Sequence, residues 1–193
     1  MRTEKLSDTK KKILSILYED GRKSLVELAR ELGITHVAVR KHLIQLEKQG
    51  LMRIQVGVNS VKMGLKLVLV FIEVDNEEHL ADIVEKFKDC PRIVFLASMV
   101  GGYNLVALMV AEDDYVLKCI STVCAVRRMQ GIRRSEVYLI ADIVKPKYLP
   151  VKITYEKKIG KTPCRRDCST CPRYISNMCL GCPATIHYRG TLL

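Results

Sequence analysis

Apolar side chains in residues 1–65 recur at the three- and four-residue spacing of one helical face. This pattern predicts three helices, over about residues 7–20, 24–33 and 35–50. Ser24 and Glu27 have the spacing of a capping box at the start of the second helix, and Gly33 falls in the tight turn before the third. The N-terminal segment is therefore expected to be a compact three-helix unit.

Two short helices joined at a glycine, the second with basic side chains outside its apolar stripe, are typical of a DNA-binding helix-turn-helix. Arg40 is suited to bidentate pairing with guanine in the major groove, and its neighbours to phosphates or base edges. The residues that we expect to contact DNA from the third helix are Thr35, His36, Arg40, Lys41 and His42.

Residues 51–61 predict two short strands joined near Gly57, which would form the wing of a winged helix-turn-helix. Arg53 and Lys62 would then lie near the DNA backbone.

Residues 66–144 alternate between apolar runs and helical stripes in the order strand, helix, strand, strand, helix, strand. The predicted segments are 67–74, 77–89, 93–100, 103–111, 113–131 and 135–144, with Gly101 and Gly102 in a hairpin turn. This βαββαβ order predicts a ferredoxin-like domain, which we expect to sense a ligand and to dimerise. Cys90, Cys119 and Cys124 are scattered through it and are expected to be small buried apolar side chains without chemistry.

The C-terminal segment holds five of the eight cysteines within a short stretch. Residues 145–163 are basic and contain prolines, which predicts a linker. Beyond it lie Cys164, Cys168, Cys171, Cys179 and Cys182, and two pairs among them have the Cys-x2-Cys spacing with which thiolates chelate one tetrahedral ion.

We expect these cysteines to bind metal and thereby to fold a tail too short to form its own core. Zn²⁺ is the first choice. An iron–sulfur cluster is the alternative, since Cys164, Cys168 and Cys171 are closely spaced, and Cys171 and Cys182 each precede a proline as in ferredoxin-type runs. A redox switch based on a disulfide is a third reading.

Net charge divides the chain in the same way. Residues 1–65 carry 13 Lys and Arg against 7 Asp and Glu, residues 66–143 carry 9 against 12, and residues 144–193 carry 10 against 2, within a total of +11. The basic ends are the parts expected to approach a polyanion such as double-stranded DNA. The chain has no apolar N-terminal signal and no long uncharged apolar run, so we expect a cytoplasmic protein that does not enter a membrane.

The chain resembles the leucine-responsive regulatory protein and AsnC family of transcription regulators over residues 6 to about 144. The matching pieces are Leu6-x-Asp8, Ile13, Leu17, Asp20-Gly21-Arg22-Lys23-Ser24, Glu27-Leu28-Ala29, Leu32-Gly33-Ile34-Thr35, Val39-Arg40, Leu46-Glu47, Gly50-Leu51, Gly64 and Val100-Gly101-Gly102-Tyr103-Asn104-Leu105. The cysteine tail lies outside this resemblance.

The resemblance implies a homodimer or larger homo-oligomer held by the βαββαβ domains, with paired recognition helices on a roughly palindromic operator. It also implies a small-molecule effector, often an amino acid, near Gly101, Gly102, Tyr103 and Asn104. The family commonly has an aspartate where this chain has Asn104, which lacks the charge that would favour an ammonium group.

The sequence therefore predicts an α+β transcription regulator and not an enzyme. Its expected parts are a winged helix-turn-helix domain (1–65), a ferredoxin-like domain (66–144), a basic linker (145–163) and a metal-stapled cysteine tail (164–193). A redox or iron–sulfur enzyme or electron carrier with an accessory DNA-binding domain is one alternative, although no nucleotide-binding glycine loop, paired carboxylates or Ser/His/Asp set supports it. A non-specific DNA-compacting protein is the other.

Overall fold

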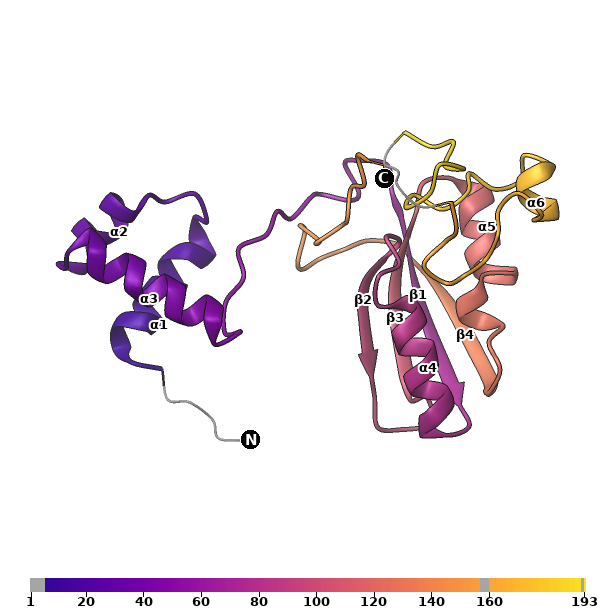
Figure 1. The fold of residues 1–193 in the computed structure, drawn as a ribbon, viewed down its shortest axis with the longest axis horizontal. Helices are drawn as coiled ribbons and strands as arrows, with labels where there is room; N and C mark the ends of the chain where they lie inside the picture. The colour runs from indigo at the N-terminus through magenta and orange to yellow at the C-terminus, as the bar shows by residue number, and fades with distance from the viewer. Residues whose placement is uncertain (1–5, 157–159, 192) are drawn as a thin grey trace. The chain divides into compact units, whose positions relative to one another are not determined.

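A computed structural model describes residues 6–156, 160–191 and 193 (Figure 1). Residues 1–5, 157–159 and 192, which fall in the predicted N-terminal domain, linker and tail, lie outside the described residues. The chain divides into two compact units, one ending at Val56 and one beginning at Gly57. Among the described residues, no helix has the length and apolar character needed to cross a membrane.

The first unit consists of three helices, as the sequence predicts. They are α1 (Asp8–Glu19), α2 (Leu25–Leu32) and α3 (His36–Lys48). Each helix contributes to one small core, which contains Ile13 of α1, Leu28 of α2, and Val39 and Leu46 of α3, all almost fully buried. The apolar positions that repeat along the sequence are thus the ones that pack together.

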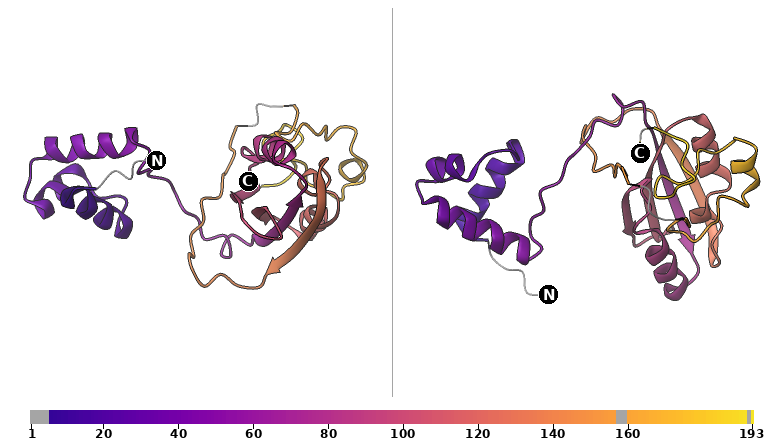
Figure 2. Two further views of the ribbon diagram at one scale, coloured as in Figure 1. Left: turned by 90° about the horizontal axis from the view of Figure 1, so that it is seen from below. Right: turned by 45° about the horizontal axis from the view of Figure 1, so that its top comes forward.

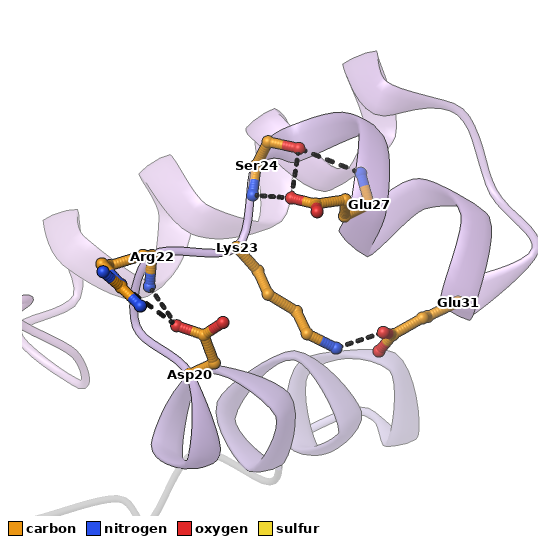
Figure 3. Close-up of polar contacts among 6 residues, drawn as sticks. All are labelled: Asp20, Arg22, Lys23, Ser24, Glu27 and Glu31. Atoms are coloured by element: carbon orange, nitrogen blue, oxygen red, sulfur yellow. Dashed lines mark hydrogen bonds and ion pairs between the residues drawn. The ribbon is translucent and has the colours of Figure 1, made fainter.

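The helix ends are set by side-chain caps (Figure 3). Ser24 and Glu27 form the predicted capping box: the Ser24 hydroxyl accepts from the Glu27 amide at 3.2 Å, and the Glu27 carboxylate accepts from the Ser24 amide at 2.7 Å. Lys23 forms an ion pair with Glu31 across α2. Gly33 ends α2 with φ +65°, a left-handed conformation that glycine adopts without strain.

The second unit contains a four-stranded antiparallel sheet with the strand order β2-β3-β1-β4, which confirms the predicted βαββαβ fold (Figure 1). Its elements are β1 (Lys66–Val74), α4 (Glu77–Phe87), β2 (Ile93–Ser98), β3 (Leu105–Ala111), α5 (Asp114–Thr122), a 3-10 turn (Ala125–Arg127), β4 (Ile132–Ile140) and the short α6 (Pro172–Ile175).

Alternate residues of the strands face opposite sides of this sheet. One side carries Val68, Val70 and Ile72, which pack in a single core with Ile83 and Phe87 of α4 and with residues of α5. The other side carries the remaining apolar residues of the strands, including Leu69, Phe71, Phe95, Leu108 and Tyr138. The helices therefore cover one face of the sheet.

The prediction of two paired strands over residues 51–61 is wrong. Residues 52–57 form no strand, and Val58 instead exchanges backbone hydrogen bonds with Leu149 at 2.9 and 3.0 Å. Gly57 lies against Tyr148, because a Cβ at this glycine would come within 3.0 Å of the Tyr148 Cβ. Partners from the C-terminal segment thus replace the predicted hairpin partners, and the boundary between units falls before the predicted residue 65.

The last strand and last predicted helix are also shifted. β4 begins and ends several residues before the predicted range 135–144, because its ladder follows β1, from Ile132 opposite Val74 to Ile140 opposite Leu67. The helix predicted over 113–131 ends at Thr122 and is followed by the 3-10 turn.

The segment predicted as a linker is partly built into the fold. Leu149 and Val151 are buried in a second core cluster with Leu65, Leu67 and Leu193. The tail beyond it contributes to the main core, through Cys164 and Leu180. Residues 57–193 therefore form one unit, in which the tail, yellow in Figures 1 and 2, lies beside α5.

Leu28→Ala should destabilise the three-helix unit by about 2–5 kcal/mol, because it removes a fully buried side chain from a small core. Thermal unfolding followed by circular dichroism measures this loss. Val26→Ala, on the same helix but 59% exposed, is the matched control and should change stability by less than about 0.5 kcal/mol. Equal effects of the two substitutions would contradict the packing described.

Candidate DNA-binding face and cysteine cavity

The exposed face of α3 carries most of the predicted DNA contacts. His36, Arg40 and Lys41 are all exposed. Thr35 caps α3, because its hydroxyl accepts from the Ala38 amide at 3.2 Å. Thr35 therefore holds the start of the recognition helix as well as standing at its exposed end.

Two apolar residues of α3 were not predicted to take part and also lie outside its buried stripe. Val37 is 63% exposed, and Ile44 is exposed as well. Apolar side chains on a recognition helix can contact the methyl group of thymine. The signal that could have identified them is their position off the core-facing stripe, because each lies two residues before a buried residue, Val37 before Val39 and Ile44 before Leu46.

His42, Arg53 and Lys62 do not share the exposed face of α3. His42 follows Val39 by three positions and precedes Leu46 by four, so it lies toward the buried stripe; it is half-buried, with a buried Nδ1 atom. Arg53 is exposed on the segment after α3, and Lys62 belongs to the second unit, in a turn where its amide donates to Asn59 at 3.0 Å. The two basic residues are therefore not held in one hairpin.

The predicted effector loop connects β2 to β3. Gly101 and Gly102 are exposed in this turn, as predicted. The Asn104 amide is used structurally: its oxygen accepts from the Val74 amide and its nitrogen donates to the Val74 carbonyl, both at 2.8 Å. Asn104 thereby closes the end of β1, and its side chain is committed to the backbone.

Tyr103 points away from this clamp, toward the sheet face that the helices leave uncovered. Its ring lies 5.7 Å from that of Phe71, and the Arg134 guanidinium lies 4.4 Å from its centre. Phe71 in turn makes an edge contact with Tyr138 at 5.8 Å. An aromatic cluster with one cation thus marks this face of the sheet.

The most unusual feature of the second unit is a cavity of about 130 Å³ between the ferredoxin-like domain and the tail. All eight cysteines line it, and we call it the cysteine cavity. Its cysteines are Cys90, Cys119 and Cys124 from the domain and Cys164, Cys168, Cys171, Cys179 and Cys182 from the tail, all of them free thiols.

The two walls of this cavity contact each other directly. The Cys119 thiol of α5 donates to the Met178 carbonyl of the tail at 3.5 Å. The Arg173 guanidinium of α6 donates to the Thr122 hydroxyl at the end of α5 at 3.2 Å. Turns then aim the tail thiols inward, as at Cys171, whose amide donates to the Cys168 carbonyl at 3.1 Å.

Cysteines 90, 119 and 124 pack in or against the core, as predicted, but they are not isolated from the other cysteines. Cys119 lies on α5, Cys124 just after it and Cys90 between α4 and β2, whereas the tail cysteines come from residues at least 40 positions later. No local spacing could have linked the two groups, because only the packing of the tail brings them together.

Arginine side chains add positive charge to the cavity. Arg92 pairs with Glu112 through two hydrogen bonds of 2.7 and 3.0 Å, and both side chains are largely buried. Arg173 differs, because its Nε and Nη2 atoms are buried and have no hydrogen-bond partner among the described residues. Unpaired buried N–H groups are costly, so an anionic occupant of the cavity would stabilise Arg173.

The thiols differ in acidity. Burial raises the pKa of Cys90 to about 12 and that of Cys182 to about 11. Side-chain interaction with the Cys119 thiol lowers the pKa of Cys179 to about 6, and the same interaction raises the pKa of Cys119. The cavity therefore contains one thiol poised to ionise at neutral pH and several that stay protonated without a cation.

Within the described residues, no group of three or more His, Cys, Asp or Glu side chains is close enough to hold a single metal ion. The thiols surround the cavity and do not converge on one point. Zn²⁺ and an iron–sulfur cluster both stay predictions.

In the metal-free chain, iodoacetamide should alkylate Cys179 fastest at pH 7, because the thiolate is the nucleophile and pH 7 lies above its pKa of about 6. The rate should fall as the pH is lowered through 6. Cys119→Ala removes this side-chain interaction, raises the pKa of Cys179 and slows its alkylation at pH 7, whereas Ser121→Ala on the same helix, outside the cavity, should not. Peptide mapping by mass spectrometry gives the rates, and a Cys179 no faster than Cys90 would refute the assignment.

The family model for winged helix-turn-helix DNA-binding domains matches residues 6–51. The regulator LrpA of Pyrococcus horikoshii is 31% identical over 109 residues, which cover 56% of this chain and 77% of LrpA.

Solved structures agree in fold. The leucine response regulatory protein LrpA of Mycobacterium tuberculosis has a TM-score of 0.65 at 19% identity, covering 76% of this chain and all of that one. A transcriptional regulator of Neisseria meningitidis, solved with L-Met, has a TM-score of 0.62 at 19% identity, covering 74% of this chain and 94% of that one. The chain belongs to the Lrp/AsnC family and is a DNA-binding transcription regulator.

Proposed function

We propose that this regulator acts as a cytoplasmic homodimer that reads a specific, roughly palindromic operator with α3, and that the occupant of the cysteine cavity controls this binding. It acts as a regulator and not as an enzyme. The observation that carries the proposal is the exposed face of α3, where Arg40 and Lys41 stand outside the buried stripe of a capped helix.

This face combines the two kinds of contact that specific DNA binding requires. Lys41 offers a point charge for a phosphate, which gives affinity for any sequence. Arg40 offers a planar guanidinium that pairs with the two acceptors of guanine, and Val37 offers an apolar contact for a thymine methyl. A face with these side chains favours a sequence-reading regulator over a DNA-compacting protein.

Arg40→Ala should weaken binding to the operator by about 1–3 kcal/mol and relax the preference at one base position. Lys41→Ala should weaken binding to all sequences about equally and reduce the salt dependence by roughly one released ion. Fluorescence anisotropy with operator and random duplexes at several salt concentrations separates the two effects. The control is Lys12→Ala, which removes an exposed charge from α1 instead of α3; equal losses in all three variants would favour non-specific binding.

The sheet face opposite the helices supports the proposed dimer through the part that Leu149, Val151 and Leu193 do not cover. It carries Phe95, 53% exposed, and Tyr138, 51% exposed, beside the Phe71 and Tyr103 rings. Aromatic side chains of this kind are enriched in the cores of protein interfaces. A second copy of the chain, with the same apolar face, would cover them in a two-fold symmetric contact.

Phe95→Lys should shift the chain from dimer to monomer, because it places a charge in the proposed apolar interface. Light scattering during size-exclusion chromatography measures the mass directly. Tyr115→Lys is the matched control, since Tyr115 is 56% exposed but lies on α5, on the helix-covered side. A Phe95→Lys variant that stays dimeric at micromolar concentration would remove this face as the interface.

The structure of the effector loop argues against an amino acid as the main effector that controls DNA binding. It therefore favours control by the occupant of the cysteine cavity. The Neisseria regulator binds L-Met, as its solved complex records. In this chain the Asn104 amide is occupied by the Val74 backbone, which leaves Gly101 and Gly102 to contact a small effector. We therefore assign the main sensing role to the cysteine cavity.

A further inference from the structure

We propose that the cysteine cavity binds an iron–sulfur cluster whose ligands come from both of its walls: Cys119 from α5, and Cys168, Cys171 and Cys179 from the tail. This assignment deepens the control role proposed above, on which its regulatory meaning rests. It also proposes a ligand role for Cys119, a domain cysteine that belongs to no local motif.

The size of the cavity is the first argument. A single Zn²⁺ ion is enclosed by four thiolates at about 2.3 Å, so that no space remains between the sulfur atoms. Here the thiols are spread, among other side chains, over the lining of a cavity of about 130 Å³, which is roughly ten times the ~10–15 Å³ that suffices for one water molecule. Such a space has room for the iron and sulfide atoms of a cluster.

The mutual positions of the thiols are the second argument. The Cys119 thiol donates to the carbonyl of Met178, the residue before Cys179, and Cys168 and Cys171 lie in one turn, in which the Cys171 amide donates to the Cys168 carbonyl. All four line the cysteine cavity, and the proposed ring of ligands crosses the contact between α5 and the tail. In a cluster with four cysteine ligands, each thiol loses its proton to solvent and its sulfur binds one iron.

Charge is the third argument. A cluster held by four thiolates is an anion, and the cavity wall provides Arg166 and Arg173, together with Asp167 and with Arg92, whose charge is paired with Glu112. The two buried, unpartnered nitrogens of Arg173 would find their acceptors in the sulfur atoms of the cluster or its ligands. Arg173 also holds the tail to α5 through Thr122, so the same residue links the occupant to the packing of the tail.

The full-length chain, purified without oxygen, provides the test. Iron, zinc and acid-labile sulfide are measured per chain together with the visible absorption spectrum. We expect iron and sulfide in equal amounts and the broad absorption of a cluster. Zinc at one per chain, with neither sulfide nor visible absorption, would overturn the proposal in favour of a single ion, and a chain with no metal would overturn it as well.

Variants test the ligand set. Cys119→Ser and Cys171→Ser should each lose most of the iron and sulfide. Cys90→Ser is the matched control, because it changes a cysteine of the same cavity outside the proposed ring and should keep the cluster. Full iron and sulfide in Cys119→Ser would show that the tail alone binds the cluster, contrary to the proposal.

Folding is checked by circular dichroism, so that loss of iron is counted only in a folded variant. If Cys119→Ser does not fold, Cys179→Ser is used instead, because it removes the proposed ligand from the opposite wall and should also lose iron and sulfide. The spectrum of the unaltered chain still shows which kind of metal centre is present.

Operator affinity separates this inference from the proposed function. If the cluster is present but its removal leaves operator affinity unchanged, the control role fails and the cluster stands. If the chain binds its operator but contains no iron and sulfide, the cluster fails and the DNA-binding role stands.

Discussion

The packing of the C-terminal tail against α5 is the contact that joins the tail and the ferredoxin-like domain into one unit. It adds Cys164 and Leu180 to the core under the sheet, and it is fixed by the Cys119–Met178 and Arg173–Thr122 hydrogen bonds. A segment this short could not fold around a core of its own, so its apolar side chains pack against the ferredoxin-like domain. The same packing brings thiols from distant parts of the chain to one cavity, and any binding chemistry of that cavity therefore reports on whether the tail is docked.

Most of the fold could be predicted because its signals are local. The three helices follow from apolar stripes, from the Ser24–Glu27 capping box and from a left-handed Gly33, each of which acts within a few residues. The strand order of the sheet follows from a βαββαβ pattern that few folds satisfy. The exposed face of α3 could likewise be predicted from the helical spacing of its apolar residues. His42 is the exception, because a polar residue was expected to be exposed but lies beside the core.

Features that depend on distant contacts could not be predicted. The expected wing strands are absent because Val58 pairs with Leu149, and the expected linker is built into the fold because Leu149 and Val151 find apolar partners near β1. The domain cysteines were treated as isolated apolar residues, since the cysteines that share a cavity with Cys119 lie mostly in the tail. In each case the sequence holds both partners, but no spacing rule joins them, and tertiary packing decides the outcome.

Backbone hydrogen exchange tests most directly whether the tail and the domain are one folded unit. It would compare the full chain with a chain that ends at residue 156. Our account predicts slow exchange for tail amides such as those of Met178 and Arg189, which donate to backbone carbonyls, and faster exchange of α5 once the tail is removed. Tail amides that exchange as fast as an unstructured peptide, with α5 equally protected in both chains, would contradict it.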